Sequence, residues 1–113
     1  MHEMSLCEGV LQILEESAVS QNFSRVKVVW LEVGRFAGVE PEAMRFSFDV
    51  VVKGTLADGA RLEMIDVLPE VWCSICDQQV EIAQRYECCP LCGGFQLQIS
   101  GGDEMRIKEL EVE

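Results

Sequence analysis

Two cysteine pairs in the second half of the chain have the spacing of metal ligands. Residues 73–76 read C-S-I-C and residues 89–92 read C-P-L-C, with twelve residues between the pairs. Each C-x-x-C turn aims two sulfurs at one point, and two such turns supply the four thiolates that Zn²⁺ accepts in a closed, structural site. The glycines at 93–94 would let backbone amides turn toward these sulfurs. We therefore predict a zinc site whose ligands are Cys73, Cys76, Cys89 and Cys92.

Three other chemistries use paired cysteines, and each fits this chain less well. A disulfide framework requires an oxidising compartment, and the N-terminus shows no secretory signal. A thioredoxin-like redox C-x-x-C usually stands alone rather than in two matched pairs. Zinc deaminases combine H-x-E with P-C-x-x-C, whereas here His2 directly precedes Glu3 and Pro90 follows Cys89. Cys88 is left over, either as a spare residue or as a ligand that exchanges with Cys89.

The only histidine of the chain is its second residue. The Met1 amine, the His2 amide nitrogen and His2 Nδ1 can form two fused chelate rings, and Glu3 can add an oxygen or its backbone nitrogen. Nitrogen donors with vacant positions suit Ni²⁺ or Cu²⁺. These residues alone leave the choice of metal open, and an ordinary terminal residue with no metal role is the alternative interpretation.

Apolar periodicity predicts the helices and strands that position these residues. A helix is expected from Leu6 to Val19, starting at an S-x-x-E capping box formed by Ser5 and Glu8. Cys7 lies on its apolar face, so we expect a small buried hydrophobic side chain there. A second helix is expected to open at Pro41, because proline suits the first helical position.

The strands predicted from the sequence flank the cysteine-rich stretch. Residues 25–33 and 61–67 are rich in β-branched and large apolar side chains, and residues 105–112 alternate. The last strand needs a sheet to pair with, so residues 70–96 are expected to be an insertion. The predicted fold is α+β, with two helices on a three-stranded sheet formed by 1–69 plus 97–113 and an inserted zinc-ribbon-like module with four cysteine ligands at 70–96.

Charge and motif content exclude several classes of function. Twenty acidic residues against nine basic ones give a formal net charge of −11, which disfavours nucleic acid and anionic membranes as partners. No apolar run approaches the roughly 18 residues of a membrane span. No Ser-His-Asp set, phosphate-binding loop or catalytic carboxylate pair is present. We expect a cytoplasmic protein that is not an enzyme, of undetermined oligomeric state.

Several of these features together resemble the HypA/HybF family of nickel metallochaperones. They are the Met1-His2-Glu3 start, the helix beginning near Leu6, the V-E-P-E helix start at 39–42 and the C-P-x-C-G sequence at 89–93. The resemblance covers essentially the whole chain, and its two ends are its most specific parts.

The resemblance implies nickel delivery to the large-subunit precursor of [NiFe]-hydrogenase, alongside a HypB-type GTPase. It implies a nickel site made of the Met1 amine, His2 and Glu3, and structural zinc on the four paired cysteines. It also implies an α/β nickel domain with a zinc domain inserted before the last strand. Two alternatives remain: a zinc-ribbon interaction module without a nickel role, and a thiol–disulfide enzyme that uses Cys88 or Cys89.

Overall fold

The structure is a computed structural model that describes residues 2–113, and the chain forms two compact units. The first unit comprises the chain up to Leu31 together with Val39–Ile65 and Arg106–Glu113. The second unit comprises Glu32–Gly38 and Asp66–Met105, and therefore contains all four paired cysteines. No helix in the described part of the chain is long and apolar enough to cross a membrane.

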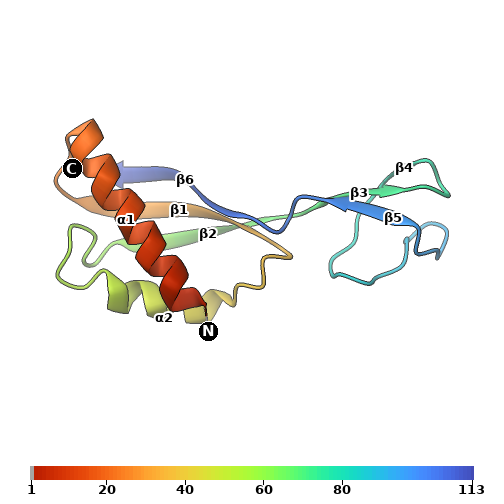
Figure 1. Ribbon diagram of the computed structural model, residues 1–113, viewed down its shortest axis with the longest axis horizontal. Coiled ribbons are helices and arrows are strands. Elements are labelled where there is room, and N and C mark those ends of the chain that lie inside the picture. The colour runs from red at the N-terminus through yellow and green to blue at the C-terminus, as the bar shows by residue number, and fades with distance from the viewer. Residues whose placement is uncertain (1) are drawn as a thin grey trace. The chain divides into compact units, whose positions relative to one another are not determined.

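The chain has two helices, and its longest strands form a three-stranded sheet (Figure 1). The strand order of the sheet is β2-β1-β6, and α1 packs against α2. This confirms the predicted α+β class. The elements are α1 (Glu3–Gln21), β1 (Val26–Gly34), α2 (Pro41–Val51), β2 (Arg61–Val67) and β6 (Met105–Val112).

Helix α1 begins one turn earlier than the sequence pattern predicted. Ser5 and Glu8 lie inside the helix, so the expected capping box is wrong. His2 occupies the N-cap position without a side-chain capping bond, and its carbonyl accepts the Leu6 N–H at 2.9 Å. The reason is that the buried stripe of α1 extends back to Glu3, whose side chain is only 8% exposed.

The core of the first unit joins both helices to the sheet. Cys7 is fully buried as expected, and its Sγ lies 3.6 Å from both the carbonyl oxygen and the Sδ of Met44. Met44 and Phe48 are the fully buried residues of α2, one turn apart. Pro41 occupies the first turn of α2, which confirms the predicted start of that helix.

The C-terminal strand returns to the sheet, as predicted. At one end of the pair, the Glu113 N–H donates to the Arg25 carbonyl and the Ser24 N–H donates to the Glu113 carbonyl, both at 2.9 Å. The end of β6 therefore lies beside the start of β1, and the two strands are antiparallel neighbours.

The second unit contains its own sheet, made of β3 (Glu70–Cys73), β4 (Gln78–Val80) and β5 (Leu97–Ser100). Central strand β3 pairs antiparallel with both neighbours, and Val71 lies opposite Val80 on one side and Ile99 on the other. Because β5 pairs with β3, residues 97–100 belong to the same unit as the cysteine-bearing segment. The buried cluster of this unit consists of Val71, Cys73, Val80, Ile82 and Cys89.

Candidate metal centres

The four paired cysteines converge on one point. Their sulfur atoms all lie within 4.8 Å of one another. Sγ of Cys73 is 3.7 Å from Sγ of Cys92, and Sγ of Cys76 is 3.9 Å from Sγ of Cys89. A tetrahedron with Zn–S bonds of about 2.3 Å has sulfur–sulfur edges of about 3.8 Å. The two observed separations fit a tetrathiolate metal site closely.

Backbone amides donate hydrogen bonds to three of these four sulfurs. The N–H groups of Cys76, Leu91 and Gly94 donate to the sulfurs of Cys73, Cys89 and Cys92, each at 3.4 Å. Gly93 has a φ of 75°, a conformation that glycine adopts without strain, and its N–H donates to the Cys89 carbonyl at 2.9 Å. The chain therefore turns back after the second cysteine pair, and a backbone amide faces a sulfur there, as expected from the two glycines at 93–94.

The thiols of the cluster differ in acidity. Burial, together with the neighbouring thiols of Cys92, Cys73 and Cys89, raises the pKa of Cys76 to about 12. Burial also opposes ionisation of Cys89, but the backbone amides of Cys92 and Leu91 outweigh it and lower the pKa of Cys89 to about 7. Four adjacent thiolates therefore need a cation to coexist, and metal binding releases the remaining protons.

Two of the three predicted nickel residues lie at the start of α1. His2 is exposed at the N-cap, and Glu3 is the first helical residue. Oε2 of Glu3 accepts the backbone N–H of Glu40 at 3.3 Å, so the carboxylate is tied to the residue that caps α2. Met1 lies outside the described residues. The three-residue nickel site therefore stays a prediction, and within residues 2–113 the only group with closely spaced ligand atoms is the cysteine cluster.

Glu40 contributes to this end of the unit in a way that the sequence pattern does not indicate. The sequence marks it only as an acidic residue at a helix start. In the structure its side chain accepts the Ala43 N–H at 2.9 Å, while its own N–H holds Glu3. No periodicity in the sequence links position 3 to position 40, so only the tertiary structure shows this contact.

The two remaining cysteines lie in opposite environments, which predicts a stepwise alkylation pattern. In metal-loaded protein we expect iodoacetamide to label one thiol, Cys88, because it is exposed and outside the cluster. Removing the metal should make the four thiols of the cluster react with iodoacetamide as well. Cys7 should react only in denaturant, because burial and the nearby Glu3 charge raise its pKa to about 11. Mass spectrometry counts the labels; Cys7 labelling as fast as Cys88 in native protein would contradict the burial.

Comparison with known proteins places this arrangement in a family. Residues 1–112 match the family described as HypA, hydrogenase/urease nickel incorporation metallochaperone. "Hydrogenase maturation factor HypA" from Alkalilimnicola ehrlichii is 59% identical over 113 residues, which covers 100% of both chains. The protein of the same name from Azotobacter chroococcum is 55% identical, again over 100% of both chains.

A solved structure shares the fold. The solution structure of the Ni metallochaperone HypA from Helicobacter pylori superposes with a TM-score of 0.70 at 24% sequence identity, covering 99% of this chain and 97% of that one. This likeness concerns the fold, while the full-length sequence match identifies the family. The chain belongs to the HypA family of hydrogenase and urease nickel-incorporation metallochaperones.

Proposed function

We propose that this protein binds Ni(II) at its N-terminus and delivers it to the large-subunit precursor of a [NiFe]-hydrogenase. The observation that carries the proposal is the family match over residues 1–112. It is supported by relatives called hydrogenase maturation factors that align along their whole length. The protein would act by holding and transferring a metal ion, so its role is not enzymatic.

The proposed nickel ligands are the Met1 amine, His2 and Glu3. Amine and imidazole nitrogens with one carboxylate form a set without sulfur, which suits Ni²⁺ and separates this site chemically from the thiolate cluster. The hydrogen bond from the Glu40 N–H holds the Glu3 carboxylate at the start of the helix. His2 is exposed beside it, so the imidazole is accessible both to an incoming ion and to a partner protein.

Transfer is proposed to proceed by stepwise ligand exchange. A site at a chain terminus can give up one donor at a time while the recipient supplies replacements. The recipient would be the hydrogenase precursor, assisted by a HypB-type GTPase in the cytoplasm. The strongly acidic charge of −11 supports faster encounter with a basic partner surface more than it supports tight binding.

The second metal site is proposed to be structural zinc held by Cys73, Cys76, Cys89 and Cys92. Zinc, when bound, would add folding free energy to a unit whose buried cluster has only five members. The support is the convergence of the four sulfurs within 4.8 Å of one another and the amides directed at three of them. All four sulfurs serve as ligands, which leaves no open position for catalysis.

Genetic replacement tests the delivery function. In a hydrogenase-producing host that lacks its own HypA-type protein, this chain should restore nickel in the purified large subunit, and His2→Ala should not. Ser5→Ala is the matched control, since Ser5 lies in the same helical turn but is not a proposed ligand. Nickel is measured by metal analysis of the large subunit. Equal restoration by His2→Ala and the native chain would refute the proposal.

A further inference from the structure

The spacer between the two cysteine pairs is held by few regular backbone contacts. After β4 ends at Val80, residues 81–96 contain neither helix nor strand. One local bond within the spacer runs from the Ala83 N–H to the Glu87 carboxylate at 2.9 Å. The two pairs nevertheless contact across this spacer, because Cys73 meets Cys92 and Cys76 meets Cys89. Contacts from outside the spacer can therefore contribute to keeping the four sulfurs together.

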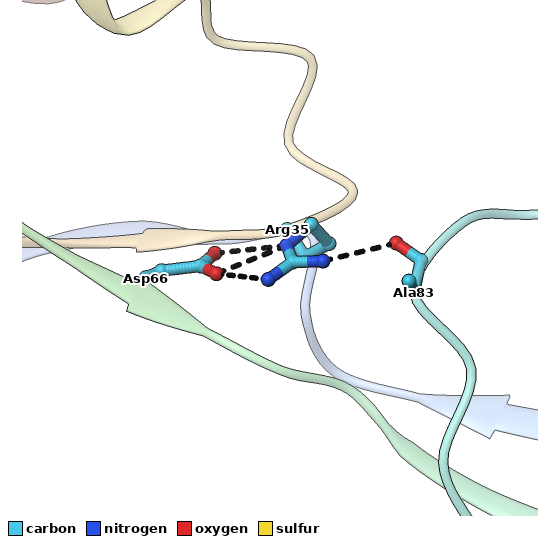
Figure 2. A network of polar contacts seen from close by, with 3 residues as sticks. All are labelled: Arg35, Asp66 and Ala83. Atoms are coloured by element: carbon cyan, nitrogen blue, oxygen red, sulfur yellow. Dashed lines mark hydrogen bonds and ion pairs between the residues drawn. The ribbon is translucent and has the colours of Figure 1, made fainter.

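Arg35 supplies one such contact from the segment that follows β1 (Figure 2). Its guanidinium binds the Asp66 carboxylate through several hydrogen bonds, including Nε to Oδ2 at 3.0 Å. Its Nη1 donates to the Ala83 carbonyl at 3.4 Å, in the middle of the spacer. Asp66 orients the guanidinium because a planar fork fits a carboxylate, and the orientation leaves Nη1 directed at Ala83.

Phe36 supplies a second contact on the buried side. It is half-buried and packs against the cluster that contains Cys73 and Cys89, which are themselves 0% and 1% exposed. The Arg85 guanidinium lies 4.8 Å from the centre of the Phe36 ring, in cation–π geometry. Phe36 therefore contacts both the buried cluster that contains two of the proposed metal ligands and Arg85, a residue of the spacer.

The backbone fixes the position from which Arg35 and Phe36 act. The Arg35 N–H donates to the Val67 carbonyl at 2.8 Å, and the Phe36 N–H donates to the Gly102 carbonyl at 2.6 Å. A Cβ at Gly34 would lie only 2.3 Å from the Gly102 backbone, so the two segments approach as closely as glycine permits. Both side chains thus project from a segment whose backbone is hydrogen-bonded to two other segments of the second unit.

We propose that Arg35 and Phe36 are positioning residues of the metal site and set how slowly the proposed zinc is released. Zinc held by four thiolates is released faster when the two cysteine pairs can separate, and separation requires the spacer to move. Arg35 restricts the spacer through its hydrogen bond to the Ala83 carbonyl. Phe36 restricts the spacer through its cation–π contact with Arg85, and it also packs against the buried cluster that contains two of the proposed ligands. The inference rests on the proposed zinc function and extends the site to residues far from the cysteines in sequence.

Zinc release from the full-length protein tests this role. Metal-loaded native protein and the variants Arg35→Ala, Arg35→Lys and Phe36→Leu are mixed with a chromogenic zinc chelator, and the release rate is followed by absorbance. We expect release on the order of tenfold faster in Arg35→Ala, taking as a guide the smallest loss of metal affinity, about tenfold, that changes outside the ligand shell cause. Arg35→Lys should resemble Arg35→Ala, because lysine cannot bind Asp66 and Ala83 together as a fork.

The matched control is Arg61→Ala. Arg61 forms an exposed ion pair with Glu63 at 2.7 Å on β2, in the first unit, and should release zinc at the native rate. If Arg35→Ala does not fold, as judged by circular dichroism, Phe36→Leu decides the question. Native release rates in the folded variants would overturn the inference. Native protein without bound zinc would instead refute the proposed zinc site, and metal analysis before mixing separates the two results.

Discussion

Nickel binding is expected to fall by more than about a hundredfold when His2 is replaced by alanine. Changes to residues outside a ligand shell already cost about 10–100-fold in affinity, and this change would remove a ligand itself. An N-terminal tag should have a comparable effect, because it converts the Met1 amine into an amide. Titration with Ni²⁺, monitored by calorimetry on untagged protein, measures both losses.

The matched control for the nickel experiment is Ser5→Ala, which leaves all three proposed ligands in place and should bind nickel like the native chain. The far-ultraviolet circular dichroism of His2→Ala should be unchanged, since the His2 side chain makes no capping bond to α1. Undiminished nickel affinity in both His2→Ala and the tagged protein would exclude the N-terminal site.

Removal of zinc is expected to unfold the second unit and leave the first unit folded. Apparent binding free energies of structural zinc are about 10–16 kcal/mol, more than the net stability of a small domain. The buried cluster of the second unit includes two of the proposed ligands, Cys73 and Cys89, so its packing should depend on the metal. The first unit has a separate core that contains Leu14, Leu31 and Phe48.

Amide signals in a two-dimensional NMR spectrum distinguish the two units. After chelation, the dispersed signals of Val71 and Ile99 should collapse, while those of Leu14 and Phe48 should keep their positions. Cys89→Ser should reproduce the chelated spectrum, and Cys88→Ser, which changes a neighbouring exposed thiol, should not. Simultaneous loss of all dispersed signals, or no change at all, would contradict independent stabilisation of the second unit by zinc.

Local sequence patterns were sufficient to predict the features that depend on neighbouring residues. The C-x-x-C turns at 73–76 and 89–92 are self-contained, and Gly93 after the second pair lets the chain turn because glycine adopts a positive φ without strain. Pro41 likewise specifies the start of α2 through a local backbone restriction. The capping box failed because Ser5 and Glu8 matched a local motif, whereas tertiary burial of Glu3 extended the helix by a turn.

Contacts between distant residues could not be predicted in this way. Nothing in the sequence pairs β5 with β3, directs Arg35 to Ala83, or brings Glu3 to the backbone of Glu40. Each contact depends on where the folded chain places segments more than 20 residues apart. The convergence of the four paired cysteines was therefore predictable from their spacing, while the contacts of distant residues around them were not.

Metal analysis of untagged protein shows whether the chain holds nickel and zinc at two separate sites. The protein is purified without any N-terminal addition, dialysed against excess Ni²⁺, freed of unbound metal and analysed for both elements. Separate nickel and zinc sites predict one zinc and one nickel per chain, and the N-terminally tagged protein should retain its zinc but hold no stoichiometric nickel. No nickel in the untagged protein, or nickel that displaces zinc from the cysteines instead of adding to it, would contradict the two-site function.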